Sequence, residues 1–158
     1  MTKTEDVPHD PHLRPARAAD AFGLLQMVRA LAAHHGDNAQ LGMDQLIQQA
    51  IGSARQFDVL VAEQDGQLVG YAAMQSVGRL QHGQRGVDLH HLYVAEAMRG
   101  SGLGTCLIDA VQQAASRAGA DYLRVAAEID NIEAQGFYRK LGMEQKPVGR
   151  SVSYERAL

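Results

Sequence analysis

The sequence contains one cysteine, no tryptophan and four prolines in 158 residues. The single Cys106 excludes an intramolecular disulfide framework and suits a reducing cytosol, so we expect a cytoplasmic protein. No apolar run approaches the roughly 18 residues of a membrane-spanning helix. Neither sign of charge dominates, because 15 Lys and Arg face 18 Asp and Glu, for a net charge of −3. We therefore expect neither a membrane nor a nucleic acid as partner.

The length suits one domain with its own core. The polar start of the chain, with Pro8 and Pro11, predicts a loose tail over 1–12 and a domain over 13–158. Strands are expected at 13–16, 58–63, 68–77, 87–94 and 122–127, and helices at about 20–34, 43–51 and 103–118 and from Asn131. Asp20 is a candidate cap of the first helix. Residues 78–86 predict a polar connection, and 145–158 predict one or two closing strands.

A glycine-rich segment, Arg99-Gly100-Ser101-Gly102-Leu103-Gly104, lies between a predicted strand and a predicted helix. Glycines allow a sharp turn and a close approach of the backbone to a ligand. The first amides of the helix have no internal partner and lie at the positive end of the helix dipole. This combination predicts a pyrophosphate site, to which Arg99 adds a charge-assisted contact.

The spacing of the residues in this segment distinguishes between several known phosphate-binding motifs. A P-loop requires a lysine that is absent here, and the interval from Gly102 to Gly104 is one residue too short for a dinucleotide fingerprint. The pattern Arg-x-x-Gly-x-Gly, preceded by a strand ending Leu-Tyr-Val, resembles the GNAT superfamily of acyl-CoA-dependent N-acyltransferases. The alternative interpretation is an ordinary glycine-rich turn before a helix.

A second segment, from Asn131 to Met143, resembles the family pattern Asn-x-x-Ala-x-x-x-Tyr-x-x-x-Gly-aromatic in order and spacing, although Met143 replaces the usual aromatic residue. Asn131 is a candidate helix N-cap, Ala134 and Tyr138 share one helix face, and Gly142 is placed to end the helix. The alternative interpretation of Tyr138 is a core aromatic residue with a solvated hydroxyl.

The resemblance implies a GNAT-type fold, a mixed α/β domain whose central, mostly antiparallel sheet is splayed in the middle and carries helices on both faces. It implies acetyl-CoA as cosubstrate. The residues that it assigns to acetyl-CoA binding are Leu92, Tyr93, Val94, Arg99, Gly100, Ser101, Gly102, Leu103, Gly104, Thr105, Asn131, Ala134 and Tyr138. A bulge near Leu92 would suit the splay. By family analogy alone we expect a homodimer, with 78–86 and the last strand as candidate contact regions.

Acetylation of an amine requires a base, because an amine such as that of Lys has a pKa of about 10.4 and is mostly protonated near neutrality. Strand alternation places Asp88 and His90 on one face and Leu89 and His91 on the other. In the family, the positions matching Asp88 and His90 often relay the proton, and His90 suits this role at neutral pH. The alternative interpretation of either histidine is a half-buried strand residue, and it is stronger for His91. No metal site is expected, because adjacent histidines diverge on a strand and no zinc-type spacing is present.

By the same resemblance, Tyr138 donates a proton to the CoA sulfur, and a backbone N–H within 92–94 polarises the thioester oxygen. The predicted function is transfer of the acetyl group of acetyl-CoA to a primary amine of a small molecule, by direct attack in a ternary complex. Two alternatives remain open: acetylation of a protein N-terminus or lysine, and a non-catalytic acyl-CoA sensor.

The acceptor is less constrained by the sequence. In the family the acceptor pocket lies near the region that here offers His34, His35, Asp37 and Asp44. The strand and the Arg-Gly loop also resemble the diamine and polyamine acetyltransferase branch. The acidic pair of that branch is replaced here by His90 and His91, which argues against a polyamine.

Overall fold

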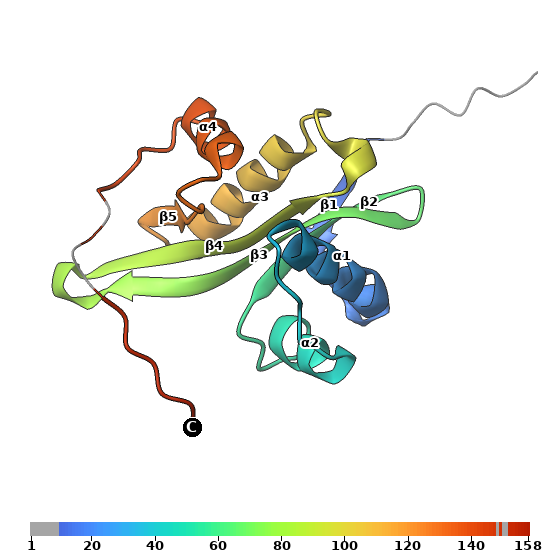
Figure 1. Ribbon diagram of the computed structural model, residues 1–158, viewed down its shortest axis with the longest axis horizontal. Helices are drawn as coiled ribbons and strands as arrows, with labels where there is room; N and C mark the ends of the chain where they lie inside the picture. The colour runs from blue at the N-terminus through green and yellow to red at the C-terminus, as the bar shows by residue number, and fades with distance from the viewer. Residues whose placement is uncertain (1–9, 148, 150–151) are drawn as a thin grey trace, which may run out of the picture. The chain divides into compact units, whose positions relative to one another are not determined.

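The computed structural model describes residues 10–147, 149 and 152–158. The chain divides into two compact units, Met1–Ala126 and Ala127–Leu158. The first unit contains a sheet and the helices α1 to α3, and the second contains α4 (Figure 1). One domain over 13–158 stays a prediction. Residues 1–9 of the predicted tail lie outside the described residues, and His12, its last residue, already begins the first strand.

Five strands form one sheet in the order β1-β2-β3-β4-β5. They are β1 (His12–Pro15), β2 (Asp58–Gln64), β3 (Gln67–Arg79), β4 (Gln84–Val94) and β5 (Tyr122–Val125). The strands β1 to β4 pair antiparallel, and β5 pairs parallel to β4. Because β5 pairs only with residues 86–89, the rest of β4, as far as Val94, continues without a β5 partner. The mostly antiparallel, splayed sheet is therefore confirmed, and the two strands part after Leu89.

Helices cover both faces of this sheet, as predicted. α1 (Ala21–His34) and α2 (Met43–Ala50) lie on one face and α3 (Leu103–Arg117) on the other (Figure 1). Under α1 and α2, Leu24 belongs to a buried cluster with Val61 and Tyr71 of the sheet. On α3, Leu107 and Val111 lie one turn apart and are both fully buried, which is the apolar stripe of an amphipathic helix.

The strands β3 and β4 form a longer hairpin than the sequence predicts. Residues 78–86 are not a polar connection, because Gly78 pairs with Arg85 and Arg79 with Gln84. A short 3₁₀ helix, Leu80–His82, closes the turn. Most residues at this end are exposed, so it lacks the alternation of apolar and polar residues that marks a half-buried strand.

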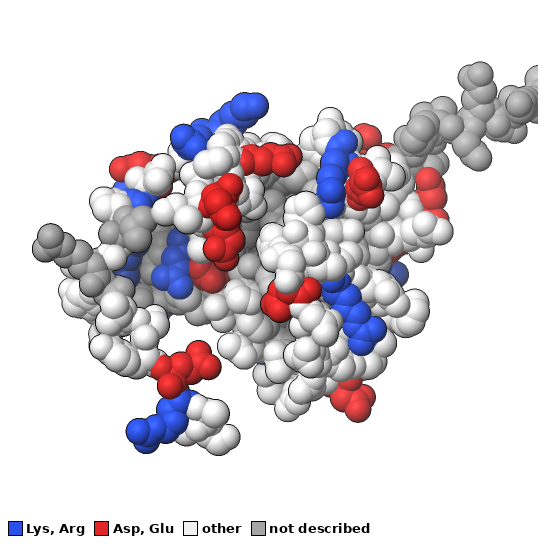
Figure 2. Space-filling view, viewed as in Figure 1, with Lys and Arg blue, Asp and Glu red and all other residues white. Residues whose placement is uncertain are grey.

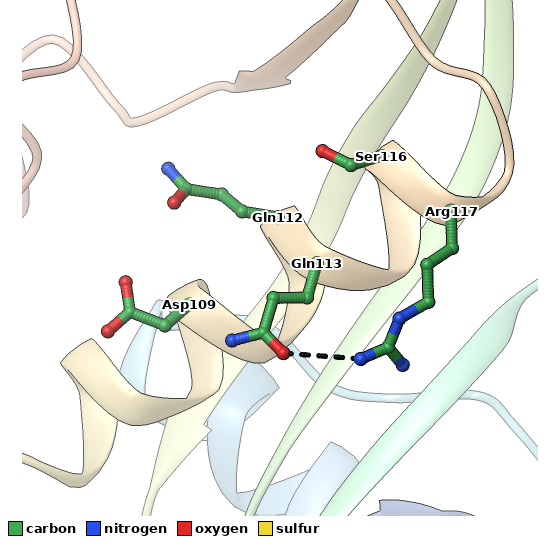
Figure 3. Close-up of a pocket in the computed structure, with 5 residues that line it drawn as sticks. All are labelled: Asp109, Gln112, Gln113, Ser116 and Arg117. Carbon is green, nitrogen blue, oxygen red and sulfur yellow. Dashed lines mark hydrogen bonds between the residues drawn. The ribbon is translucent and has the colours of Figure 1, made fainter.

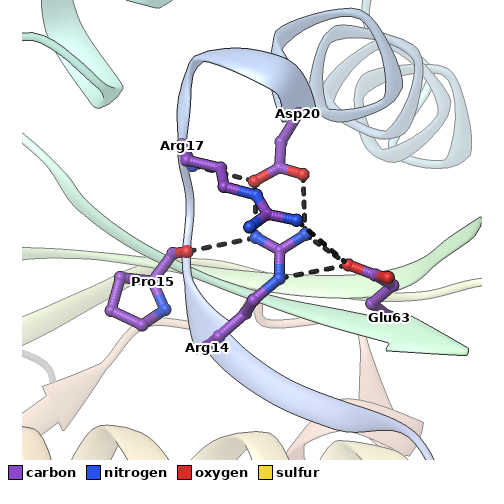
Figure 4. A network of polar contacts seen from close by, with 5 residues as sticks. All are labelled: Arg14, Pro15, Arg17, Asp20 and Glu63. Atoms are coloured by element: carbon purple, nitrogen blue, oxygen red, sulfur yellow. Dashed lines mark hydrogen bonds and ion pairs between the residues drawn. The ribbon is translucent and has the colours of Figure 1, made fainter. Parts of the chain in front are cut away.

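Asp20 precedes α1, but its side chain does not cap the helix as predicted. Its carboxylate accepts hydrogen bonds from Arg14 Nη1 (2.7 Å), from Arg14 Nη2 (2.9 Å) and from the backbone N–H of Arg17 (2.8 Å) (Figure 4). The Arg14 guanidinium also pairs with Glu63 of β2. Hydrogen bonding to Arg14 lowers the pKa of the Asp20 carboxyl. This network ties the start of α1 to β1 and β2.

The second unit contains α4 (Ile132–Lys140). The Asn131 side chain accepts a hydrogen bond from the Ala134 N–H (3.1 Å), and Gly142, at φ 78°, follows the helix. Both signals that the sequence places at the ends of α4 are confirmed. The predicted closing strands are not formed by 145–147, 149 or 152–158, and 148, 150 and 151 lie outside the described residues. Val152 and Tyr154, whose spacing favours a strand, are both exposed and have no buried face.

Candidate functional site

The glycine-rich segment forms a turn between a 3₁₀ helix, η3 (Glu96–Met98), and α3. Gly100 and Gly102 have φ of 78° and 89°, a left-handed conformation that costs an L-residue with a Cβ roughly 1–2 kcal/mol. A Cβ added at Gly102 would meet no atom within 4 Å. The glycines are therefore required by the backbone of the turn and leave open space above it.

The first turn of α3 presents unused backbone donors next to this space. The first hydrogen bond of the helix runs from the Cys106 N–H to the Gly102 carbonyl (3.1 Å). The N–H groups of the three residues between them, Leu103, Gly104 and Thr105, precede it and have no helical partner. Such N–H groups, at the positive end of a helix dipole, suit a phosphate group.

Two polar side chains of the turn are held by backbone carbonyls. Arg99 Nε donates to the carbonyl of Val94 (3.2 Å), at the end of β4, and Ser101 Oγ donates to the carbonyl of Met98 (2.5 Å). The Arg99 side chain is otherwise exposed, so its Nη groups are accessible to solvent. The Arg99 bond also joins the two predicted acetyl-CoA-binding segments of the first unit, 92–94 and 99–105.

β4 contains a bulge at His90. Ala73 of β3 pairs with His91 and Met74 pairs with Leu89, so His90 is an extra residue with no partner in this register. The bulge lies earlier in β4 than the predicted position near Leu92. It changes the face on which the residues after it lie, because one inserted residue shifts the period-two alternation of a strand.

The bulge brings the two histidine rings together instead of separating them. Their centroids are 4.5 Å apart and their planes differ by 20°. The prediction that His91 faces away from His90 is therefore wrong, because regular alternation fails at a bulge. Phe57, which precedes β2, also stacks on His90, with centroids 4.9 Å apart. In the described part of the chain, no group of three or more His, Cys, Asp or Glu residues could hold a metal ion.

Tyr71 on β3 contacts the second histidine. Its hydroxyl oxygen lies 3.1 Å from His91 Nδ1, and its side chain is almost fully buried. Burial raises the pKa of the Tyr71 hydroxyl. Burial, with the nearby His90 and His35, lowers the pKa of His91 to about 4. Both groups are uncharged at neutral pH. Sequence reasoning misses Tyr71, because only the pairing of β3 with β4 brings it to His91.

Asp88, the other predicted proton acceptor, is engaged by the neighbouring strand. Arg124 Nε on β5 donates to Asp88 Oδ1 at 2.7 Å. This charge-assisted bond engages Oδ1 of the carboxylate. His90, by contrast, is exposed. Of the two predicted proton acceptors, Asp88 is thus held by an ion pair, whereas His90 is open to solvent.

Tyr138, the predicted proton donor, lies on α4 in the second unit. Its side chain is half-buried, and burial raises the pKa of its hydroxyl. Its ring lies against that of Phe137, with centroids 5.3 Å apart. A hydroxyl that keeps its proton at neutral pH can donate it to a departing anion, which is the role the sequence predicts.

Lys and Arg are scattered over the face shown in Figure 2 and form no continuous patch there. A depression of about 500 Å³ on α3 is lined by Asp109, Gln112, Gln113, Ser116 and Arg117 (Figure 3). It contains none of the predicted site residues. Within the residues that the structure describes, no helix is both long and apolar enough to cross a membrane.

Solved structures with this fold are numerous. The chain superimposes on an aminoglycoside N-acetyltransferase in complex with CoA with a TM-score of 0.77, at 19% identity over 98% of this chain and 99% of that one. It superimposes on a ribosomal-protein-alanine N-acetyltransferase from Brucella melitensis with a TM-score of 0.72, at 19% identity over 91% of this chain and 99% of that one. At such identities these likenesses show the fold alone.

Relatives found by sequence share more identical residues with this chain than these structures do. An L-methionine sulfoximine/L-methionine sulfone acetyltransferase of Pseudomonas paraeruginosa is 37% identical over 93 residues, which cover 58% of this chain but only 54% of the relative. The chain thus matches about half the length of that enzyme. The thialysine N-epsilon-acetyltransferase of Mus musculus is 30% identical over 142 residues, covering 84% of this chain and 83% of the relative. The sequence model of the acetyltransferase (GNAT) family matches residues 25–143, and the chain therefore belongs to this family.

Proposed function

We propose that this protein transfers the acetyl group of acetyl-CoA to a primary amine of a small molecule. The observation that carries the proposal is the open turn at Gly100 and Gly102, which leads into the unused N–H groups of α3. Relatives named for acetylating thialysine and L-methionine sulfoximine support a small-molecule acceptor.

The pyrophosphate of acetyl-CoA binds at the turn in this proposal. The N–H groups of residues 103–105 and the Nη groups of Arg99 supply its donors. The pantetheine chain follows residues 92–94, where β4 has no β5 partner. The family resemblance adds Asn131, Ala134 and Tyr138 from the second unit. The Asn131 side chain already accepts a hydrogen bond from the Ala134 N–H, so we assign it the structural role of capping the N-terminus of this short helix.

The reaction is a direct attack within a ternary complex. The amine nitrogen forms a bond to the thioester carbon, the carbon–sulfur bond breaks, and an amide and free CoA result. His90 accepts the proton that the amine loses, and a backbone N–H within 92–94 stabilises the negative charge on the carbonyl oxygen. Tyr138 donates its hydroxyl proton to the departing sulfur and regains one from solvent.

The test is release of the CoA thiol from acetyl-CoA across a panel of acceptors. The panel contains amino acids, thialysine, polyamines and peptides with a free N-terminus or lysine. We expect turnover with one or more of the small amines. Turnover with peptides alone would replace the proposal by protein acetylation. Acetyl-CoA binding without turnover on any acceptor would identify a non-catalytic sensor.

A further inference from the structure

The hydrogen bond between Tyr71 and His91 has a direction that the surroundings determine. A neutral imidazole has one protonated nitrogen, which donates, and one unprotonated nitrogen, which accepts. The Tyr71 hydroxyl is almost fully buried, and a buried O–H without an acceptor is unfavourable. Within residues 10–126, the acceptor that lies within reach of it is His91 Nδ1, at 3.1 Å. The hydroxyl therefore donates to Nδ1, and the proton of His91 lies on Nε2.

The groups around His91 keep this ring neutral. His90 stacks on it from the same strand, Tyr71 reaches it from β3, and His35, which follows α1, acts on it by its charge. Both histidines are cations when protonated, so each opposes a charge on His91. Burial acts in the same direction and is the largest cause of its lowered pKa.

The bulge makes this contact available. Tyr71 and Ala73 belong to the buried cluster under α1 and α2, and His91 pairs with Ala73. In a regular strand His91 would instead share the face of Leu89, which pairs with Met74. The inserted residue moves His91 to the face of Tyr71 and leaves His90 exposed beside it.

We infer that Tyr71 is a positioning residue of the histidine pair: it holds the neutral His91 ring in the form protonated at Nε2, so that His90 alone in the pair accepts the proton of the acceptor amine. The inference rests on the proposed function. It assigns different tasks to two adjacent residues of the same type. No residue within 10–126 forms a hydrogen bond to the ring nitrogens of His90, which leaves them available for this proton.

The first test measures the position of the proton and does not depend on activity. Long-range ¹H–¹⁵N correlation spectra of the full chain at neutral pH distinguish the two neutral forms of an imidazole. We expect His91 to be protonated at Nε2 alone. In Tyr71→Phe we expect both neutral forms, because the hydroxyl that donates to Nδ1 and selects the form protonated at Nε2 is lost. Tyr122→Phe, which removes a hydroxyl from β5, is the matched control and should leave the His91 signals unchanged.

A proton on His91 Nδ1 in the wild type, or an unchanged His91 in Tyr71→Phe, would overturn the inference.

The second test compares two variants that each keep a ring at the altered position. His90→Phe removes the proposed base. The double variant Tyr71→Phe/His91→Phe removes both hydrogen-bond partners together, so that no polar group is left buried without one.

With the acceptor found in the thiol-release panel, the acidic limb of the pH dependence of kcat should persist in the double variant and disappear in His90→Phe. The opposite result would overturn the inference. If no acceptor supports turnover in the wild type, the proposed function fails, whereas the spectra still decide the form of His91. The two failures are therefore distinguishable.

Discussion

Replacing Gly102 by alanine tests what the left-handed turn contributes to stability and to binding. Gly102 has φ 89° and ψ 1° at the N-cap of α3, and an alanine there costs about 1–2 kcal/mol. The added Cβ meets no atom within 4 Å, so no clash inside the chain adds to this cost. In chains of about 150–250 residues, 1 kcal/mol lowers Tm by about 2–4 °C, so we expect a loss of about 2–8 °C.

The same methyl group is expected to weaken acetyl-CoA binding. It would occupy the space through which the pyrophosphate approaches the N–H groups of α3. A hydrogen bond to a charged group contributes about 1.5–3 kcal/mol, and each 1.4 kcal/mol is about tenfold in Kd. Loss of one such bond therefore raises Kd by about 10- to 150-fold. Calorimetry with acetyl-CoA, well below the melting temperature of each protein, measures this change.

Gly119 provides the matched control. It follows the other end of α3 at φ 77°, and a Cβ there also meets no atom within 4 Å. Gly119→Ala should lower Tm by a similar amount and leave the Kd for acetyl-CoA unchanged. A folded Gly102→Ala protein with lowered Tm and unchanged Kd would refute the placement of the pyrophosphate. Equal weakening by both substitutions would show that stability, and not the turn, controls binding.

Three further predictions concern stability, catalysis and assembly. Asp20→Asn should lower the free energy of unfolding at neutral pH by about 2–3 kcal/mol, because charge-assisted bonds to Arg14 are lost. Since this pairing lowers the pKa of Asp20 from its ordinary 3.8, the stabilisation is present above that pH and is lost as pH falls through the folded-state pKa. Denaturant titrations should therefore converge in acid, and a constant difference would contradict the reasoning. Tyr138→Phe should lower kcat by about 10²-fold with unchanged acetyl-CoA affinity, and full turnover with chemistry rate-limiting would exclude the proton-donor role. Light scattering should show a homodimer, and a monomer at high micromolar concentration would argue against it.

Most of the fold can be predicted from local signals in the sequence. The apolar stripe of α3, the Asn131 cap and Gly142 mark the ends and faces of helices, because capping and amphipathicity act within a few residues. Asp20 shows where this reasoning fails. Its side chain is a good cap by type, but it bonds to Arg14 and to the Arg17 N–H instead, and the Arg14 contact depends on how β1 leads into α1.

In the candidate site, too, local features can be predicted from the sequence and long-range contacts cannot. The glycine turn is local: the sequence predicts a sharp turn there, and Gly100 and Gly102 form it. The relation of Asp88 to Arg124 and of His91 to Tyr71 is not local, since each joins strands that are distant in the sequence. Pairing register therefore decides which of the candidate bases is engaged, and a single sequence does not reveal that register.

One signal of the bulge is nevertheless present in the sequence. The apolar residues of β4 lie at Val87 and Leu89 and then at Leu92 and Val94, so the alternation changes phase between 89 and 92. A strand that keeps one face on α3 throughout must insert one residue in that interval. The insertion lies at His90. Keeping the leucines and valines of β4 on the α3 face thus requires the bulge. The bulge in turn brings the two histidine rings together on the opposite face of the sheet.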